Sequence, residues 1–305
     1  MNFTNSLKYI GGIYLTYKAF SFLKWSFQFL PSIIPSVSNS LQSKYGNGWV
    51  VITGGSSGIG LSYAKELLSL NYNVCILSHS SDKLNSAYET LTQNNPTSSQ
   101  VRYIKYDLNR NYDENDYNEL SNKIMKATDN GNISILINNA GVITRGNLIA
   151  NSIEQIISMI NINIKATVFL TKIILTIHKS NKNNKHKLLI ITSGSIAGKG
   201  RYMGRSVYSG TKYFLESFME SIAKENKDDI DCTCFEIGPV ETEMNKADVK
   251  FKLRSDDFVK KALSYVGKGD TIRSGCFTHE LYIRLREIGI IEGIIDKMII
   301  PKNIL

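Results

Sequence analysis

The chain has 305 residues, of which 42% are hydrophobic and 21% charged, and its formal net charge is +9. These proportions fit one large globular domain with extra segments. The positive charge is not gathered into a stripe, which argues against nucleic-acid binding and suits an anionic membrane face or an anionic substrate.

Cysteine and histidine give no sign of a disulfide framework or a metal site. Cys232 and Cys234 stand two apart on a predicted strand, and no second pair follows at zinc-site spacing. We therefore expect the four cysteines to be buried core thiols. The four histidines are scattered along the chain, at His79, His178, His186 and His279.

Residues Leu7–Pro35 form an apolar, aromatic-rich stretch. Lys8, Lys18 and Lys24 interrupt it, so no run reaches the roughly 18 uncharged apolar residues expected of a spanning helix. The stretch can span as a marginal helix with snorkelling lysines, lie in the interface, or pack on the domain as an N-terminal helix. A signal peptide is disfavoured because no small-residue cleavage site follows the apolar core.

A strand, a glycine turn and a helix follow one another from Trp49 onward. Trp49–Ile52 is an apolar run typical of a buried strand, and it leads directly into the turn Thr53–Gly60. A helical stripe begins at Leu61. In this context, glycines let the backbone approach a pyrophosphate, whose charge the helix N-terminus receives. The segment therefore predicts a dinucleotide site.

The second predicted strand ends without an acidic residue. Ser78-His79-Ser80-Ser81 follows it, and the first carboxylate is Asp82. Because an acidic residue at this point binds the ribose 2′-OH of NAD, its absence favours NADP. His79, the serine hydroxyls and Lys83 are candidates for the 2′-phosphate, and a solvated turn is the alternative.

Apolar runs alternate with helical stretches, which predicts an α/β fold with a Rossmann-like, doubly wound parallel sheet. The predicted strands are Trp49–Ile52, Val74–Leu77, Val101–Ile104, Ile133–Ile137, Leu188–Thr192 and Cys232–Ile237. We interpret the Asn-rich stretches Asn109–Asn118 and Asn181–Asn184 as surface turns that carry no chemistry.

Ser195, Tyr208 and Lys212 form the strongest chemical signal. Tyr208 and Lys212 are four residues apart in a segment of helical composition, so their side chains share one face. A fixed cation beside a phenol favours the phenolate and suits the tyrosine for proton transfer at neutral pH. Ser195, thirteen residues before Tyr208, can hydrogen-bond the reacting oxygen.

Apolar residues also recur at helical spacing near the C-terminus, from Ile288 to Ile299. Such a stripe fits burial against the domain, against a second subunit or in a membrane surface. We divide the chain into an N-terminal membrane anchor or interfacial segment (1–47), a single catalytic domain (48–285) and an amphipathic tail (286–305).

Together these motifs resemble the short-chain dehydrogenase/reductase family over Trp49–Thr242. Asn138-Asn139-Ala140-Gly141 is similar to the family's segment beside the cofactor. Asn163 corresponds to its catalytic asparagine, which holds a water linking the lysine to solvent. Gly238–Thr242 resembles the segment that closes over the nicotinamide.

The resemblance implies site residues throughout this region and implies no metal. The expected catalytic residues are Asn163, Ser195, Tyr208 and Lys212, with Ser195 also contacting substrate. The expected contacts to NADP(H) are Gly54, Ser56, Ser57, Gly58, Ile59, Gly60, His79, Asp107, Asn139, Ala140, Gly141, Tyr208, Lys212, Val240 and Thr242.

Within the family, the chain resembles the microsomal very-long-chain 3-oxoacyl-CoA reductases and the type 12 and type 3 17β-hydroxysteroid dehydrogenases. Gly48–Gly54, Met159–Ile164 and Phe258–Leu263 carry this likeness. Three features depart from it, and one of them is that the tail Pro301-Lys302-Asn303-Ile304-Leu305 lacks the dilysine signal of some members. Gly55-Ser56-Ser57 resembles the 3-ketodihydrosphingosine reductases instead, and His79 stands where many NADP-dependent members have arginine.

The subgroup implies an NADPH-dependent enzyme of the endoplasmic reticulum membrane, facing the cytosol, that reduces 3-oxoacyl-CoA in fatty-acid elongation. Its partners would be a lipid or acyl-CoA substrate, the membrane surface and a second copy in a homodimer. Lys199, Arg201 and Arg205 are candidates for the CoA phosphates, or an ordinary solvated loop. The alternatives are a sphingoid-base, steroid or retinoid keto reductase, and a catalytically silent nucleotide-binding scaffold.

Overall fold

The computed structural model divides into two units, Met1–Val37 and Ser38–Leu305. The described residues are 3–29, 38–93, 95, 97–181, 185–200, 203–245, 252–267 and 270–287. The C-terminal stripe that begins at Ile288 lies outside the described residues.

The first unit contains helix α1 (Phe3–Phe29). Large apolar side chains along it are exposed, among them Tyr9, Ile13, Leu15 and Phe20. By length and hydropathy alone, one described segment could cross a membrane, and it is Ile153–Ser180 rather than α1. Half of the most apolar part of that segment is buried inside the second unit, as in the core helix of a globular domain.

A seven-stranded sheet in the order β3-β2-β1-β4-β5-β6-β9 forms the centre of the second unit, and every pairing in it is parallel. Its strands are β1 (Trp49–Thr53), β2 (Asn73–Ser78), β3 (Val101–Lys105), β4 (Ile133–Asn138), β5 (Leu188–Ser193), β6 (Ile230–Phe235) and β9 (Ile272–Arg273). A two-stranded pair, β7 (Val240–Glu241) with β8 (Leu253–Arg254), lies outside this sheet.

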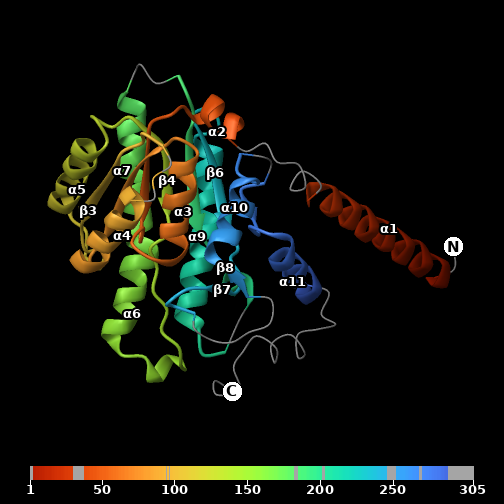
Figure 1. Cartoon of the computed structure of the whole chain (residues 1–305). Helices are drawn as coiled ribbons and strands as arrows, with labels where there is room; N and C mark the ends of the chain where they lie inside the picture. Colours follow the sequence, from red (N-terminus) through yellow and green to blue (C-terminus); the bar gives the residue numbers. More distant parts are fainter. Residues whose placement is uncertain are drawn as a thin grey trace. The chain divides into compact units, whose positions relative to one another are not determined.

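Two groups of helices flank the sheet (Figure 1). The first group is α3 (Gly58–Ser69), α4 (Ser81–Gln93) and α10 (Ser255–Leu263), and α3 contacts the other two. The second group is α5 (Glu114–Ala127), α7 (Ala166–Ser180) and α9 (Ser206–Glu225). Because helices cover both faces, the central strands are buried on both sides and consist of nearly continuous apolar runs.

The helices of the second group build the main hydrophobic cluster. Leu120 from α5, Ile173 from α7 and Met219 from α9 pack there against Val51 and Leu136 of the sheet. The predicted doubly wound parallel sheet is therefore confirmed. Strand order reverses between β1 and β4, and in such folds ligands bind beyond the carboxyl ends of the strands at that point.

Shorter elements complete the second unit. They are α2 (Ser38–Tyr45), the 3-10 turn η2 (Leu148–Ala150), α6 (Ile153–Ile160), the π-helical turn η3 (Asn161–Lys165), α8 (Ala197–Gly200) and α11 (Phe277–Glu287). Helix α2 already belongs to this unit, because the Tyr45 hydroxyl donates to Asp231 at 2.7 Å and Lys44 forms an ion pair with the same carboxylate.

One expectation from the sequence is wrong. The stretch Asn109–Asn118 is not a turn throughout, because α5 begins at Glu114. Asp113 caps this helix, and its carboxylate accepts from Asp116 N at 2.8 Å while the Asp116 carboxylate accepts from Asp113 N. The expected thiols are confirmed: Cys75, Cys232, Cys234 and Cys276 are free and buried.

Candidate active site

Tyr208 and Lys212 lie one helical turn apart on α9. The Lys212 ammonium is 5.6 Å from the centre of the Tyr208 ring and donates to the carbonyl oxygen of Ser193 at 2.7 Å. Lys212 is only 4% exposed, so this bond and the nearby ring fix its position in a poorly solvated place. The spacing along the helix therefore brings a phenol and a cation together, as expected.

Ser195 follows β5 and precedes α8. Its hydroxyl accepts from Ala197 N at 3.2 Å and lies 3.5 Å from the carbonyl oxygen of Ile237. These contacts orient the hydroxyl at the carboxyl ends of β5 and β6. Ser195 and Tyr208 both line the same cavity.

Asn163 is fully buried in the π-helical turn η3. Its amide accepts from Val142 N at 2.8 Å and donates to Val142 O at 3.0 Å and to Thr211 Oγ1 at 3.1 Å. A Cβ built on Gly141 would lie 3.4 Å from Asn163 Oδ1 and 3.5 Å from Lys212 Nζ. Asn163, Gly141 and Lys212 therefore converge, although Asn163 does not itself line the cavity.

The glycine turn closes tightly on the start of α3. A Cβ on Gly60 would lie 2.3 Å from the carbonyl oxygen of Gly54, so only glycine fits there. Ser57 precedes α3 in extended conformation, and its side chain makes no capping bond. The N-terminus of this helix therefore presents backbone N–H groups and a free hydroxyl toward the cavity, a suitable arrangement for an anion.

Sequence reasoning missed the polar contacts that hold the glycine turn against β4 and β5. Thr53 Oγ1 accepts from Asn139 N at 2.9 Å and from Ala140 N at 3.0 Å. The Asn139 side chain donates to Thr53 O and accepts from Ser193 Oγ. Thr53 and Ser193 are the last residues of β1 and β5. A polar residue at the end of an apolar run is the feature of the sequence that could have indicated these contacts.

The cavity between these elements has a volume of about 380 Å³. Most of the expected cofactor residues line it: Gly54, Ser56, Ser57, Gly58, Ile59, His79, Asp107, Asn139, Ala140, Gly141, Tyr208, Lys212, Val240 and Thr242. Gly60 does not line the cavity because it packs beneath Gly54. Residues as far apart along the chain as Gly54 and Thr242 are thus gathered around one space.

Two basic side chains stand where β2 leads into α4. His79 is exposed and lines the cavity, as does Lys83. The Lys83 ammonium pairs with the Glu243 carboxylate at 2.5 Å, joining α4 to the segment after β7. Ser56 donates to Ser78 at 3.0 Å, which ties the glycine turn to the end of β2.

The basic residues expected near the substrate have different surroundings. Lys199 pairs with the buried Glu236 at 2.9 Å, so its charge is already compensated. Arg205 lines the cavity, and Arg201 lies outside the described residues. Arg145, which the sequence did not single out, also lines the cavity and is exposed to solvent.

Two buried titratable groups, Glu216 and His279, lie near the site but do not line the cavity. Burial, and then the charge of Glu236, raise the pKa of Glu216 to about 7. Burial also lowers the pKa of His279 to about 4, so its imidazole is neutral. His279 Nδ1 accepts from Gly238 N at 3.1 Å and thereby holds the start of the segment Gly238–Thr242.

The comparisons agree with this geometry. A sequence profile described as short chain dehydrogenase matches residues 48–252. The chain is 31% identical to the very-long-chain 3-oxoacyl-CoA reductase of Coccidioides immitis, covering 70% of this chain and 58% of that protein. It is 29% identical to the 17-beta-hydroxysteroid dehydrogenase type 3 of Mus musculus, covering 76% of this chain and 73% of that protein.

A solved structure gives the same fold. The short-chain dehydrogenase from Sphingobium yanoikuyae in complex with NADPH aligns with a TM-score of 0.66 at 21% identity. The alignment covers 81% of this chain and 96% of that one. The expected resemblance in sequence is therefore confirmed, and the expected fold with it.

Proposed function

The chain belongs to the short-chain dehydrogenase family and is an oxidoreductase, and from that premise we propose that it reduces the keto group of a long-chain 3-oxoacyl-CoA with NADPH. The observation that carries the proposal is the convergence of Tyr208, Lys212 and Ser195 on one cavity beside a glycine turn. The similarity to a very-long-chain 3-oxoacyl-CoA reductase supports the choice of substrate.

The residues around the cavity fit NADPH. The N-terminus of α3 and the free Ser57 hydroxyl suit the pyrophosphate, and a side chain at Gly60 would collide with Gly54. No carboxylate follows β2 before Asp82, and the exposed His79 imidazole can donate a hydrogen bond to the 2′-phosphate, as can Lys83, whose ammonium is paired with Glu243. The NADPH bound to the similar Sphingobium yanoikuyae enzyme supports the same cofactor here.

In the proposed reaction the bound NADPH supplies a hydride to the keto carbon. Tyr208 gives its phenolic proton to the carbonyl oxygen, so that a ketone becomes a secondary alcohol. Ser195 donates a hydrogen bond to that oxygen and holds it near Tyr208. Lys212 favours the phenolate that is left and binds the nicotinamide ribose, while Asn163 helps to return a proton from solvent.

Arg145 and Arg205 suit the phosphates of a CoA ester, because both line the cavity that holds Tyr208. Apolar side chains on the same walls suit the acyl part, among them Ile143, Ile196 and Met244. A substrate with a charged head and an apolar tail thus matches the lining better than a small polar ketone.

Steroid reduction is the second candidate. The 29% identity to a 17-beta-hydroxysteroid dehydrogenase type 3 favours it, and the apolar lining suits a steroid ring system as well. A steroid carries no phosphate for Arg145, which is exposed at the cavity wall. For this reason we prefer a 3-oxoacyl-CoA to a steroid as the substrate.

The test is NADPH oxidation by the detergent-solubilised protein with a long-chain 3-oxoacyl-CoA. 3-Ketodihydrosphingosine, a 17-ketosteroid and NADH are assayed in parallel. Turnover of the acyl-CoA that needs NADPH and vanishes in Tyr208→Phe is expected. Selective turnover of another ketone would replace the substrate, and cofactor binding without turnover of any ketone would favour a nucleotide-binding scaffold.

We also propose that the protein resides in the endoplasmic reticulum membrane with its catalytic unit facing the cytosol. The 27 residues of α1 would span roughly 40 Å at 1.5 Å per residue, more than the hydrocarbon core of a bilayer. Its exposed aromatic and aliphatic side chains support membrane contact. Retention of the full chain in membranes after carbonate extraction would support a spanning anchor, whereas release would favour an interfacial one.

A further inference from the structure

The loop between β3 and α5, residues Tyr106–Asp113, forms one wall of the cavity. Tyr106, Asp107 and Leu108 line it directly. The loop begins at the carboxyl end of β3, two strands away from β1 on the side opposite to β4, and thus away from Tyr208 and Lys212. It therefore flanks the adenosine half of a dinucleotide bound across the strand ends.

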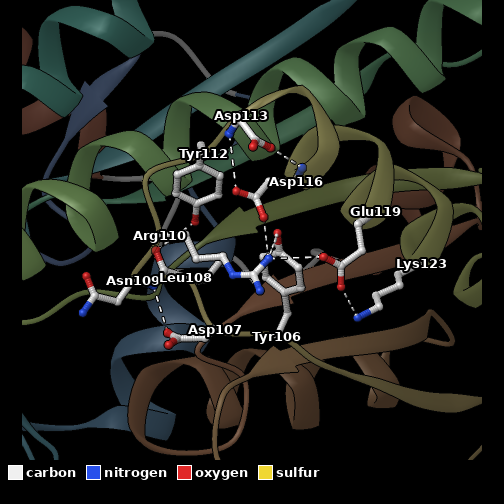
Figure 2. Close-up of polar contacts among 10 residues, drawn as sticks. All are labelled: Tyr106, Asp107, Leu108, Asn109, Arg110, Tyr112, Asp113, Asp116, Glu119 and Lys123. Atoms are coloured by element: carbon white, nitrogen blue, oxygen red, sulfur yellow. Dashed lines mark hydrogen bonds and ion pairs between the residues drawn. The ribbon is translucent and has the colours of Figure 1, made fainter.

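Arg110 fastens this loop to α5 (Figure 2). Its Nη1 donates to the Tyr106 hydroxyl at 3.1 Å, to Asp116 at 2.5 Å and to Glu119 at 3.2 Å. The guanidinium also lies 4.8 Å from the centre of the Tyr106 ring. Lys123 donates to Glu119 at 2.6 Å and extends the network along the helix.

Further contacts fix the shape of the loop itself (Figure 2). Asp107 Oδ1 accepts from Asn109 N at 2.9 Å, and the Tyr112 hydroxyl donates to Leu108 O at 2.9 Å. Tyr112 has φ of +27°, which a non-glycine residue adopts only when its surroundings impose it. These contacts give the loop a defined shape, so a restraint at one end of the loop is passed on to the other end.

The same loop is bonded to the turn that carries Asn163. Asn161 Nδ2 donates to Asn109 Oδ1 at 3.2 Å, and Lys165 Nζ donates to Asn111 Oδ1 at 3.4 Å. The rings of Tyr112 and Phe169 lie 4.5 Å apart just beyond the turn. Asn161 is only 4% exposed, so the donor end of its bond to Asn109 is shielded from water.

The turn η3 is a π-helical turn inside the long helical segment Ile153–Ser180. Such widened turns are rare and concentrate at functional sites. Thr167 Oγ1 donates to Asn163 O at 3.2 Å, a side-chain bond to a carbonyl of the widened turn. The hydrogen bonds from Asn109 and Asn111, which lie outside the helix, help to stabilise the π-helical turn.

We propose that Asn109 and Asn161 are positioning residues that link the adenosine end of the cofactor site to Asn163. The proposal rests on the proposed binding of NADP(H). A ligand that packs on Asp107 and Leu108 restrains the loop, the loop restrains Asn161, and Asn161 restrains the turn that orients Asn163. Occupation of the adenosine site therefore stabilises the catalytic arrangement some distance away.

The linking residue can be tested from the solvent side, because Asn109 is exposed and its truncation removes little packing. Asn109→Ala removes the acceptor for Asn161. Asn109→Asp keeps an acceptor oxygen and serves as the conservative rescue. Asn118→Ala is the matched control, since Asn118 is an exposed asparagine on α5 outside this network.

The probe is adenosine 2′,5′-bisphosphate, which contains the adenosine half of NADPH and no nicotinamide. The readout is hydrogen exchange of the amides of residues 161–165 with and without the probe. Binding is expected to slow their exchange about threefold to tenfold in the wild type, the range that one hydrogen bond supplies. The slowing should persist in Asn109→Asp and Asn118→Ala and disappear in Asn109→Ala.

Calorimetry in parallel separates this inference from the proposed function. If the probe binds and the exchange of residues 161–165 slows equally in Asn109→Ala, the link is absent. The same conclusion follows if bound probe leaves that exchange unchanged in the wild type. If the probe does not bind at all, the proposed NADP(H) site is refuted, and the proposed link to Asn163 is refuted with it.

Activity gives a second readout. Asn109→Ala should lower kcat with NADPH about threefold to tenfold and leave KM for the acyl-CoA unchanged, because the bond acts on Asn163 rather than on substrate. A rise in KM at constant kcat would contradict the positioning role.

Discussion

The ammonium of Lys212 lies 5.6 Å from the centre of the Tyr208 ring because the two residues stand one turn apart on α9. The bond from Lys212 to Ser193 O fixes the cation at the carboxyl end of β5. This relationship joins a proton donor to a residue that can also hold a ribose. Replacing Tyr208 and replacing Lys212 should therefore have different effects on turnover and on NADPH binding.

Tyr208→Phe removes the proton donor and keeps the ring. We expect kcat to fall by a factor of about 10² to 10⁴ while NADPH binding is retained. Lys212→Met removes the cation, so kcat should fall and the Kd for NADPH should rise about tenfold, or about 1.4 kcal/mol. Stopped-flow turnover and fluorescence titration measure the two effects. Tyr213→Phe, at a 59% exposed position beside them, is the control and should change neither.

His79 should decide part of the preference between the two nicotinamide cofactors. His79→Asp places a carboxylate at the end of β2, where it repels a 2′-phosphate and accepts from a ribose 2′-OH. We expect the ratio of kcat/KM for NADPH to that for NADH to fall at least about tenfold. His79→Asn adds no charge and should change the ratio far less. An unchanged ratio in His79→Asp would mean that the 2′-phosphate is bound elsewhere.

Glu216 makes stability depend on pH in a defined direction. Burial raises its pKa from 4.5 to about 7, so the folded state keeps a proton that the unfolded state releases between these values. Its contribution is therefore complete below pH 4.5 and is lost as pH rises through 7. Glu216→Gln keeps the neutral form at all pH values. Relative to wild type, it should gain up to about 3 kcal/mol between pH 4.5 and pH 8.

Urea unfolding of wild type and Glu216→Gln at pH 5 and pH 8 measures this difference. Glu225→Gln, at the exposed C-terminal end of α9, is the control and should show almost no trend. A constant difference between wild type and Glu216→Gln across the range would show that Glu216 titrates normally in the folded state.

Replacing glycine by alanine should have opposite effects at Gly60 and Gly210. Gly60→Ala brings a Cβ within 2.3 Å of Gly54 O, so the glycine turn must deform and NADPH binding should be lost. Gly210→Ala meets nothing within 4 Å on α9 and should stabilise the fold by about 0.5 to 1 kcal/mol. Thermal unfolding and NADPH titration compare them. Normal cofactor binding by Gly60→Ala would refute the proposed role of the turn.

The strands were predictable because they are buried on both faces. A strand such as β4 (Ile133–Asn138) is buried along its whole length and is mostly apolar, and the expected run Ile133–Ile137 differs from it by one residue. The pairing of Tyr208 with Lys212 was predictable for a similar reason, since helical spacing alone puts them on one face. Both signals are local in sequence.

The polar contacts that complete the site were not predictable in this way. Asn139 bonds Thr53, which is 86 residues earlier, and Asn161 bonds Asn109, which is 52 residues earlier. Such pairs have no periodicity, and their partners are known only once the strands and helices are in place. Lys199 was expected to be a candidate for the CoA phosphates. In the structure its ammonium is paired with Glu236, a partner 37 residues later that the sequence alone does not reveal.

The most direct measurement follows a hydride label through the reaction. The protein is incubated with a long-chain 3-oxoacyl-CoA and NADPH that carries deuterium at the pro-S position of the nicotinamide, and the product is analysed by mass spectrometry. We predict one deuterium on carbon 3 of the 3-hydroxyacyl-CoA, and at least about 100-fold less labelled product in the same time with Tyr208→Phe. NADPH that binds without passing its deuterium to carbon 3 would contradict the proposed reduction.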